Sequence, residues 1–307
     1  MFGAENNNMS KGKLLITGSN GFLGSNLVNH FLQNDYEVYG SDLQLVSLGG
    51  TQISYISGDL TDQKFASELI EKVKPDYVIN TVALVNLDVC ENDTAKAYQI
   101  NVLTAKNIAQ ATGQKGIRMV HISTDHFFNG SKSYYSEDDI PNPVNNYGKT
   151  KLEAEKECLN NNPNTIVIRT NFYGWSSNAH KLTFGEWLYE SLYYKKPINL
   201  FTDYYFSPIE VTALAEAVEL AMKSEFKGVI NIAGSERCSK YEFAIALADV
   251  FGLDKQMISA VKMDPQSFNV KRQPDLSLSN DKFNRLFDME LPDVKAGLLR
   301  FKATRRI

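Results

Sequence analysis

Short apolar runs, many of them rich in β-branched residues, alternate with longer stretches of helical period along the first half of the chain. Strands that alternate with helices of about 10–15 residues are typical of βαβ units. Runs that are apolar throughout are typical of strands buried on both faces of a parallel sheet. The pattern therefore predicts an α/β fold with a Rossmann-like, doubly wound parallel sheet. We expect strands at 14–17, 37–41, 53–57, 77–80, 118–123 and 165–169, and helices at 22–33, 61–72, 96–112 and 147–159.

The regular alternation of strand-like and helical stretches ends in the second half of the chain. Residues 172–206 are dense in aromatic side chains, and two interpretations have equal weight. The segment forms either a core helix flanked by loops, or the wall of a cleft that buries a ring-shaped ligand. Beyond it we expect a helix at 211–223, a strand at 229–232, a helix at 241–251 and an end rich in loops.

A glycine turn follows the first expected strand, in residues 14–24 (LLITGSNGFLG). Gly18 allows a tight turn, Gly21 lets the backbone approach a pyrophosphate, and Gly24 lets the next helix pack closely on the sheet. Backbone N–H groups and the positive helix end then hold phosphate oxygens. Because a strand precedes the turn and an amphipathic helix follows it, the motif predicts a dinucleotide site. The expected binding residues of the turn are Gly18, Asn20, Gly21, Phe22, Leu23 and Gly24.

Asp42 ends the second expected strand, at about 20 residues after the glycines. An acid at this place accepts hydrogen bonds from the adenosine ribose and repels a 2′-phosphate. Residues 43–50 contain no Arg or Lys to bind such a phosphate. The sequence therefore favours NAD as the cofactor, with NADP as the alternative. A plain strand-end aspartate is the alternative role for Asp42.

Tyr147 and Lys151 are four residues apart in an expected helix, and hence on one helical face. A cation beside a phenol stabilises the phenolate, so we expect a lowered pKa for Tyr147. The tyrosine then exchanges a proton with a carbonyl or alcohol oxygen while hydride moves to or from a nicotinamide. Thr124 follows the strand at 118–123, at the sheet edge where α/β proteins bind ligands. Its hydroxyl is expected to share the substrate oxygen with Tyr147.

Together these motifs resemble the extended short-chain dehydrogenases/reductases, and most closely the dTDP-4-dehydrorhamnose reductase family. The resemblance runs from about residue 13 to residue 299. It implies a Rossmann-like sheet with a smaller C-terminal substrate-binding lobe. Besides the glycine turn it rests on 58–62 (GDLTD), 75–80 (PDYVIN), Asn101, 123–130 (STDHFFNG), 147–151 (YGKTK) and 169–170 (RT).

The resemblance also implies roles for single residues. Asp59 and Leu60 would lie beside the adenine, and Ala83 would line the cofactor trough. Asn101 matches a helix asparagine that supports the lysine relay, and Lys151 would also bond the nicotinamide ribose. The expected catalytic residues are thus Thr124, Tyr147, Lys151 and Asn101, and the expected substrate contacts are Asp125, His126, Asn171 and Arg272.

Two departures from the family pattern bear on the substrate. The family usually has Ser-Thr-Asp-Tyr-Val-Phe-Asp-Gly where this chain has His126 and Phe127. Sugar-nucleotide dehydratases carry a glutamate base in place of His126, so dehydration is disfavoured; the histidine either touches substrate or is merely packed. The family's Arg-Pro motif is present only as residues 271–274 (KRQP). Arg272 either grips a phosphate through paired N–H bonds or is an exposed loop cation.

The composition and charge of the chain limit the partners, metals and compartment that we expect. The net charge is -4 and the pI is near 5.7, so we expect no nucleic-acid partner. No apolar stretch approaches the length of a membrane span and no signal peptide opens the chain, so we expect no membrane partner. Three cysteines without CxxC spacing suit a reducing compartment, and the histidines lack metal-ligand spacing. We therefore expect a cytoplasmic protein without a metal.

The leading prediction is an NAD(P)-dependent reductase of a nucleotide-linked 4-keto-6-deoxy sugar, in polysaccharide synthesis. One alternative is an epimerase of the same superfamily, which returns the hydride. The other is a non-catalytic, cofactor-binding regulatory subunit, as in methionine adenosyltransferase, although a complete catalytic set argues against it. The resemblance also implies a homodimer. We expect a disordered leader at 1–12, an NAD(P)-binding domain at 13–171 to which 207–232 returns, and a substrate-binding lobe from 172–206 and 233–307.

Overall fold

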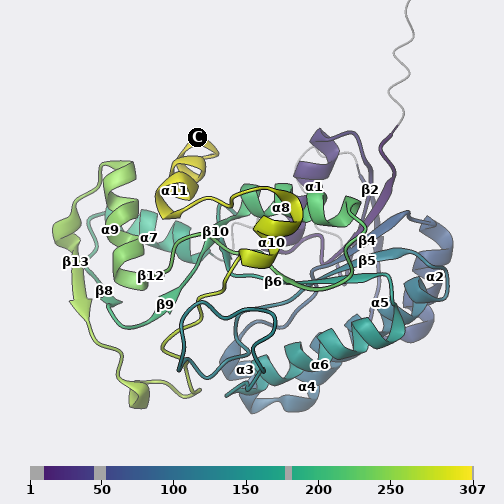
Figure 1. The fold of residues 1–307 in the computed structure, drawn as a ribbon, viewed down its shortest axis with the longest axis horizontal. Coiled ribbons are helices and arrows are strands. Elements are labelled where there is room, and N and C mark those ends of the chain that lie inside the picture. The colour runs from purple at the N-terminus through teal and green to yellow at the C-terminus, as the bar shows by residue number, and fades with distance from the viewer. Residues whose placement is uncertain (1–9, 45–52, 177–181, 306–307) are drawn as a thin grey trace, which may run out of the picture.

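A seven-stranded parallel sheet forms the centre of the computed structural model, which describes residues 10–44, 53–176 and 182–305 (Figure 1). Most of the expected leader lies outside the described residues. The strand order is β11-β6-β5-β4-β1-β2-β3, and every neighbouring pair is parallel. The strands are β1 (Lys13–Thr17), β2 (Glu37–Asp42), β3 (Ser54–Ser57), β4 (Tyr77–Asn80), β5 (Arg118–Ile122), β6 (Thr165–Arg169) and β11 (Gly228–Asn231).

Helices cover both faces of this sheet (Figure 1). Successive residues of a strand point to opposite faces. Leu14 and Ile16 therefore pack in the core beside α1 and α8, whereas Leu15 packs beside α2, α5 and α6. The predicted doubly wound α/β fold is confirmed. The helices are α1 (Phe22–Gln33), α2 (Gln63–Val73), α5 (Thr104–Gly113), α6 (Asn146–Asn161) and α8 (Val211–Lys223).

The strand order reverses at β1. The chain first adds β2 and β3 on one side of β1 and then crosses to β4 on the other side. Loops at the carboxyl ends of β1 and β4 therefore diverge, and open α/β sheets bind ligands in the crevice that this leaves.

The segment expected as one helix at 96–112 is divided. A π-helical turn, η1 (Gln99–Leu103), separates α4 (Thr94–Tyr98) from α5, and α3 (Leu87–Asn92) precedes both. The side chains of Asn86 and Asp93 cap α3 and α4, which the hydrophobic period did not indicate. π-Helical turns are frequent at functional sites, and Gln99 and Ile100 of this one line the groove described below.

A smaller lobe lies at the left in Figure 1. Its elements are α7 (Phe184–Tyr193), β8 (Ile198–Phe201), α9 (Lys240–Phe251), β13 (Ile258–Val261) and α11 (Val294–Ala303). Tyr173, Leu188, Phe206 and Phe243 are buried together in its core. Each interpretation of the aromatic segment 172–206 is right for part of it. Tyr173, Tyr189 and Phe206 lie in this core, Phe172 lines the pocket described below, and Trp187, Tyr193 and Tyr194 are exposed.

The expectation of a loop-rich end is wrong for two stretches. α10 (Asp281–Phe287) and α11 lie there, because Asp293 caps α11 and buried Leu298 and Phe301 give it an apolar face. Short elements join the lobe to the sheet or lie within it. They are β7 (Phe172–Tyr173) paired with β10 (Ile209–Glu210), β9 (Tyr205–Phe206) paired with β12 (Cys238–Ser239), η2 (Lys255–Met257) and η3 (Pro265–Ser267).

Candidate active site

A groove of 680 Å³ lies at the carboxyl ends of β1, β2 and β4. Its walls come from the glycine turn, the end of β2, the loop after β3 and the loop after β4. This is the crevice at which the strand order reverses, the place where such sheets bind dinucleotides. The predicted cofactor residues that line it are Gly18, Gly21, Asp42, Asp59, Leu60 and Ala83.

The glycine turn has the close backbone packing that the sequence predicts. Gly18 has a φ of +74°, a left-handed conformation that favours glycine. A Cβ atom on Gly24 would overlap the carbonyl group of Gly18, so a larger residue would push α1 away from β1. Leu23 lines the neighbouring pocket. Asn20 and Phe22 are not among the described wall residues of either cavity.

Backbone N–H groups hold the Asp42 carboxylate in place. Oδ2 accepts from the N–H of Asn20 at 3.1 Å, and Oδ1 accepts from that of Leu43 at 2.8 Å. Each carboxylate oxygen keeps accepting capacity for a ribose hydroxyl. Asp59 is held similarly, because its Oδ1 accepts from the N–H of Thr61 at 2.9 Å. Part of the cation-free segment after Asp42 lies outside the described residues, so the preference for NAD stays a prediction.

A second pocket, of 300 Å³, adjoins the groove and shares Thr81 and Ala83 with it. It combines the loop after β5, the first turns of α6, the loop after β6 and a C-terminal loop. All predicted catalytic and substrate residues except Asn101 therefore share one cavity. Those in its wall are Thr124, Asp125, His126, Tyr147, Lys151, Asn171 and Arg272.

Tyr147 lies in the first turn of α6, where Asn145 caps the helix through the N–H of Gly148 at 2.9 Å. The phenol is 8% exposed. Burial raises the pKa of Tyr147 above its ordinary value, and a hydrogen bond with Thr124 acts in the opposite direction. The expected lowering by Lys151 is therefore wrong for this structure, because desolvation of the phenolate is the largest effect. Tyr147 is protonated at neutral pH, which suits a general acid.

Lys151 lies one turn further along α6 and is 1% exposed. Its Nζ donates to the carbonyl oxygen of Ile122 at 2.8 Å and lies 3.4 Å from Nε2 of His121. Burial lowers the pKa of Lys151 to about 8. The lysine therefore changes its protonation state close to neutral pH.

Asn101 lies in η1 and is 1% exposed. Its Oδ1 accepts from the N–H of Leu84 at 2.6 Å, and its Nδ2 donates to the hydroxyl of Thr150 at 3.0 Å. The side chain thus fastens the wall of the cofactor groove to α6. In the described ranges its side-chain bonds do not reach Lys151, so the relay role that the resemblance implies stays a prediction.

Asp125 lines the pocket beside the other residues predicted to contact substrate, and is 1% exposed. Its Oδ2 accepts from Nδ2 of Asn171 at 2.5 Å, and its Oδ1 accepts from the Thr124 hydroxyl at 3.2 Å. His126 stands edge-on to Tyr147, with ring centroids 5.4 Å apart. Burial lowers the pKa of His126, and its Nδ1 is buried without a partner among the described residues. The neutral histidine therefore offers a free ring nitrogen at the pocket.

Arg272 also lines the pocket, and its buried Nε has no partner in the ranges that the structure describes. Two nearby residues were missed by sequence reasoning. Tyr204 shares a side-chain hydrogen bond with Arg272. The Nζ of Lys240 lies 3.2 Å from the ring centroid of Phe206, and burial lowers the pKa of this lysine to about 7. No motif marks them, because only tertiary packing brings them to Arg272.

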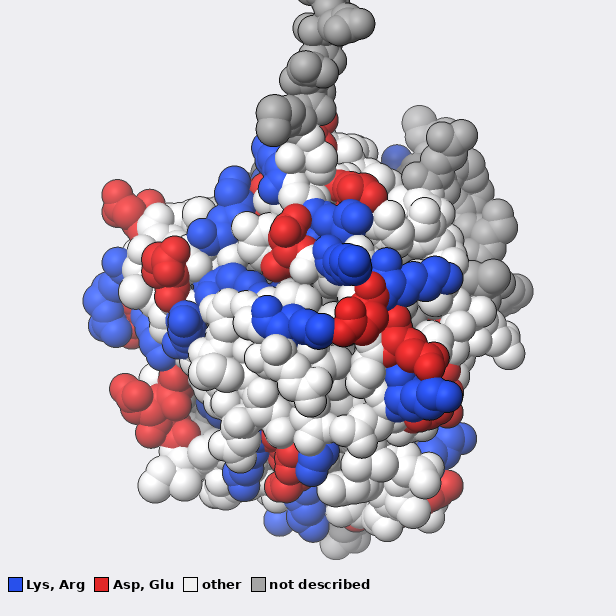
Figure 2. All heavy atoms as spheres, turned by 90° about the vertical axis from the view of Figure 1, so that its right-hand side faces the viewer, with Lys and Arg blue, Asp and Glu red and all other residues white. Residues whose placement is uncertain are grey.

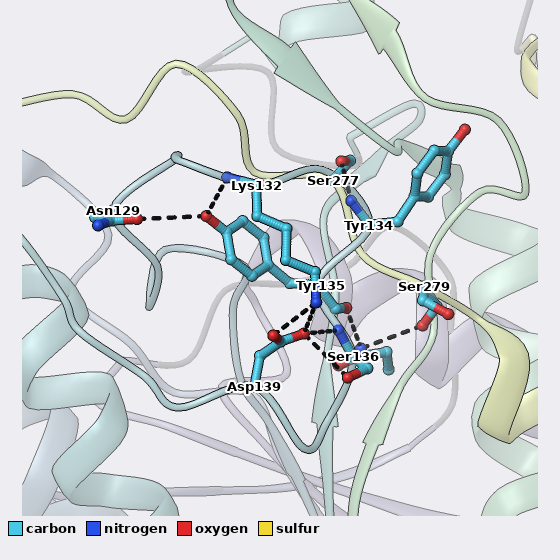
Figure 3. A network of polar contacts seen from close by, with 9 residues as sticks. Asn129, Lys132, Tyr134, Tyr135, Ser136, Asp139, Ser277 and Ser279 are labelled. Atoms are coloured by element: carbon cyan, nitrogen blue, oxygen red, sulfur yellow. Dashed lines mark hydrogen bonds and ion pairs between the residues drawn. The ribbon is translucent and has the colours of Figure 1, made fainter.

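A hydrogen-bond network joins the loop after β5 to the segment that carries Arg272 (Figure 3). The N–H of Tyr134 donates to Oγ of Ser277 at 2.8 Å, and the N–H of Tyr135 donates to the backbone carbonyl of Ser277 at 2.8 Å. The N–H of Ser279 donates to the carbonyl of Tyr135 at 2.9 Å. Because the loop after β5 carries Thr124 and the other segment carries Arg272, the network connects two parts of the pocket wall.

The surface and the remaining polar side chains show no sign of another kind of site in the described part of the chain. Basic and acidic side chains are interspersed on the face shown in Figure 2. Within the described ranges, no helix is both long and apolar enough to cross a bilayer. Over the same ranges, no group of three or more His, Cys, Asp or Glu is placed to hold a metal ion. The three cysteines are buried and unpaired.

The sheet order, the glycine turn and the shared pocket of Thr124, Tyr147 and Lys151 define an extended short-chain dehydrogenase/reductase, as the sequence predicts. The chain belongs to the family described as RmlD substrate binding domain, whose profile matches residues 12–306.

Relatives of two kinds are similar to this chain. Methionine adenosyltransferase 2 subunit beta of Bos taurus is 30% identical over 264 residues, which are 84% of this chain and 78% of that protein. The spore coat polysaccharide biosynthesis protein SpsK of Bacillus subtilis is 31% identical over 249 residues, 80% of this chain and 82% of that protein. In structure, the dTDP-4-dehydrorhamnose reductase of Bacillus anthracis, in complex with NADP, superposes with a TM-score of 0.86 at 23% identity. That superposition covers 96% of this chain and 100% of the other.

Proposed function

We propose that this protein is an NAD(P)-dependent reductase of a nucleotide-linked 4-keto-6-deoxy sugar. The observation that carries the proposal is the continuity of the two cavities. The groove that would hold the dinucleotide meets the pocket of Thr124, Tyr147 and Lys151 at Thr81 and Ala83, so a bound nicotinamide would supply hydride to a sugar carbonyl held in the pocket. The family membership and the polysaccharide biosynthesis relative support this choice of substrate class. We also propose a cytoplasmic homodimer.

The residues that line the groove have the chemistry that binding of a dinucleotide requires. Gly18, Gly21 and the start of α1 would hold the pyrophosphate, since a side chain in the turn would collide with backbone. Asp42 would accept from the adenosine ribose, and Lys151 would bond the second ribose. When bound, the nicotinamide supplies the hydride. NAD is the preferred form because of Asp42, with NADP, which the Bacillus anthracis reductase binds, as the alternative.

The side chains of the pocket supply the proton. Tyr147 is protonated and gives its hydroxyl proton to the carbonyl oxygen, which becomes the hydroxyl group of the product. Thr124 donates a second hydrogen bond to the same oxygen and so favours the charge that develops on it. Lys151 returns a proton to the tyrosine after each turnover. Asn101 holds the groove wall against α6 and keeps these groups aligned.

The remaining pocket residues would bind the sugar nucleotide. Asp125, oriented by Asn171, would accept from a sugar hydroxyl, and His126 would contact the same ring through its free nitrogen. Arg272 would hold a phosphate of the substrate, because its guanidinium lines the pocket, its Nε has no partner in the described part of the chain, and Tyr204 orients it. With His126 where dehydratases carry a glutamate, elimination of water lacks its base.

A regulatory subunit is the second candidate, and a specific observation favours it. The chain is 30% identical to a methionine adenosyltransferase subunit. A regulatory protein would bind the cofactor tightly, show no turnover with any sugar nucleotide, and associate with a catalytic subunit. The complete proton-transfer set of the pocket favours the reductase, because a non-catalytic subunit has no need of it.

A panel of enzymatically prepared nucleotide 4-keto sugars, followed by the absorbance of NADH and NADPH, tests the proposal. A reductase consumes one reduced cofactor for each sugar converted. An epimerase converts the sugar without net consumption, and a regulatory subunit does neither while still binding the cofactor. Tyr147→Phe is the matched control, because it keeps the pocket shape and removes the proton.

A further inference from the structure

A chain of buried polar side chains runs from the end of β1 to the catalytic lysine. The hydroxyl of Thr17 donates to Oδ1 of Asn80 at 2.9 Å, and Nδ2 of Asn80 lies 3.1 Å from Nδ1 of His121. Nε2 of His121 lies 3.4 Å from Nζ of Lys151. None of these side chains is more than 1% exposed. The ends of three neighbouring strands, β1, β4 and β5, are thus linked to Lys151.

The amide of Asn80 has one orientation. The backbone N–H of Val82 donates to its Oδ1 at 3.1 Å, and a backbone N–H has no accepting capacity. Oδ1 is therefore the acceptor, and Nδ2 is the donor toward His121. Nδ1 of His121 must accept this bond. In the neutral ring the proton then resides on Nε2, the nitrogen that faces Lys151.

The His121 ring is neutral because burial, together with the charge of Lys151, holds the pKa of His121 well below its ordinary value. An N–H group directed at an ammonium finds no lone pair, whereas a neutral amine offers one. Lys151 keeps its donor bond to the Ile122 carbonyl in either state. The tautomer of His121 therefore discriminates between the two protonation states of Lys151.

We propose that His121, fixed by Asn80 as the Nε2–H tautomer, is a positioning residue that favours the neutral amine of Lys151 and so sets the pH at which the lysine exchanges its proton. The other titratable groups that face Lys151 are Glu155 and Cys158 on its own helix, with Tyr147 one turn before it. Glu155 is ion-paired with Arg169 of β6 at 2.8 Å. The tautomer and the lysine charge are properties of the resting protein; only their kinetic consequence rests on the proposed function.

Nuclear magnetic resonance on the whole chain tests this without any substrate. Nitrogen-15 histidine labelling reads the tautomer of His121, and carbon-13 lysine labelling reads the titration of Lys151. His121→Gln and Lys151→Arg identify the two sets of signals. We expect a neutral His121 protonated on Nε2 in the wild-type protein. A wild-type ring protonated on Nδ1 would overturn the proposal, whatever the sugar assays show.

Asn80→Asp is the decisive variant, because a carboxylate accepts from Val82 but has no proton to give His121. His121 should change to the Nδ1–H tautomer, and the pKa of Lys151 should rise by about one unit or more. Thr17→Val is the matched control: Val82 still orients the amide, so tautomer and pKa should stay as in wild type. A rise in the lysine pKa without the tautomer change would show that added charge alone acts, and would refute the proposal. If Asn80→Asp does not fold, the wild-type tautomer decides.

Discussion

Gln273 donates from its Nε2 to the backbone carbonyl of His126 at 3.3 Å, and its side chain is completely buried. Both residues are departures from the family pattern. The glutamine separates Arg272 from the proline that usually follows the arginine, and the histidine replaces a tyrosine. Because the acceptor is the main-chain carbonyl of residue 126, this bond ties the segment 271–274 to the loop after β5 beside the pocket.

Gln273→Met should show what this contact does. The substitution keeps most of the volume but leaves the His126 carbonyl without this donor, at a cost of about 1–3 kcal/mol in the free energy of unfolding. We expect KM for the sugar nucleotide to rise several-fold while KM for the cofactor stays constant. Urea denaturation and steady-state kinetics measure the two effects, with exposed Gln266→Met as the control. An equal rise in both KM values would contradict the proposal that Gln273 supports the part of the pocket that binds the sugar nucleotide.

Tyr147→Phe should lower kcat by about 100-fold or more, the scale of a lost general acid, because the variant has no hydroxyl proton to give. The fold and the affinity for the cofactor should be retained, as circular dichroism and cofactor titration would show. Tyr194→Phe, at a tyrosine that is 63% exposed, is the control. Wild-type turnover in Tyr147→Phe would disprove the assignment.

The parts of this molecule that could be predicted are those with a local signature. The glycine turn, the sheet strands and the pair Tyr147 and Lys151 follow from spacing and periodicity within a few residues of each other. Lys240 could not be found, because it reaches the neighbourhood of Arg272 only when the smaller lobe packs against the loop after β5. The pKa direction of Tyr147 was wrong for a related reason: desolvation depends on the packed surroundings, whereas spacing gives only the neighbouring charge.

The pH dependence should report Lys151. Its pKa is lowered to about 8 by burial, so the ammonium is present below that pH and is lost above it. If the lysine returns the proton to Tyr147, kcat/KM for reduction should be level below about pH 8 and fall about tenfold per pH unit above it. Lys151→Arg keeps a cation but releases no proton in this range, so kcat/KM should be low at every pH and show no fall near pH 8. A profile in the wild type that stays level to pH 10 would rule out this role.

Asp42→Ser should reduce the preference for NADH over NADPH. The change removes an unfavourable contact between a carboxylate and the 2′-phosphate, which we place at about 1–3 kcal/mol, the scale of a hydrogen bond to a charged group. The ratio of kcat/KM values for the two cofactors measures it. Asp59→Ser, in the same groove but held by Thr61, is a control for general loss of cofactor affinity. A wild-type enzyme that prefers NADPH would show that Asp42 does not act on the ribose.

Arg272→Ala should weaken binding of the sugar nucleotide and leave the cofactor unaffected. The guanidinium lines the pocket, and its Nε has no hydrogen-bond partner among the described residues. Loss of a charge-assisted pair corresponds to about 1.5–3 kcal/mol, or about tenfold or more in KM for the sugar nucleotide. Lys271→Ala is the matched control, because this neighbouring cation is exposed. Arg272→Lys should restore only part of the affinity, since an ammonium cannot make two parallel N–H bonds. Equal KM changes in the Lys271 and Arg272 variants would move the phosphate site elsewhere.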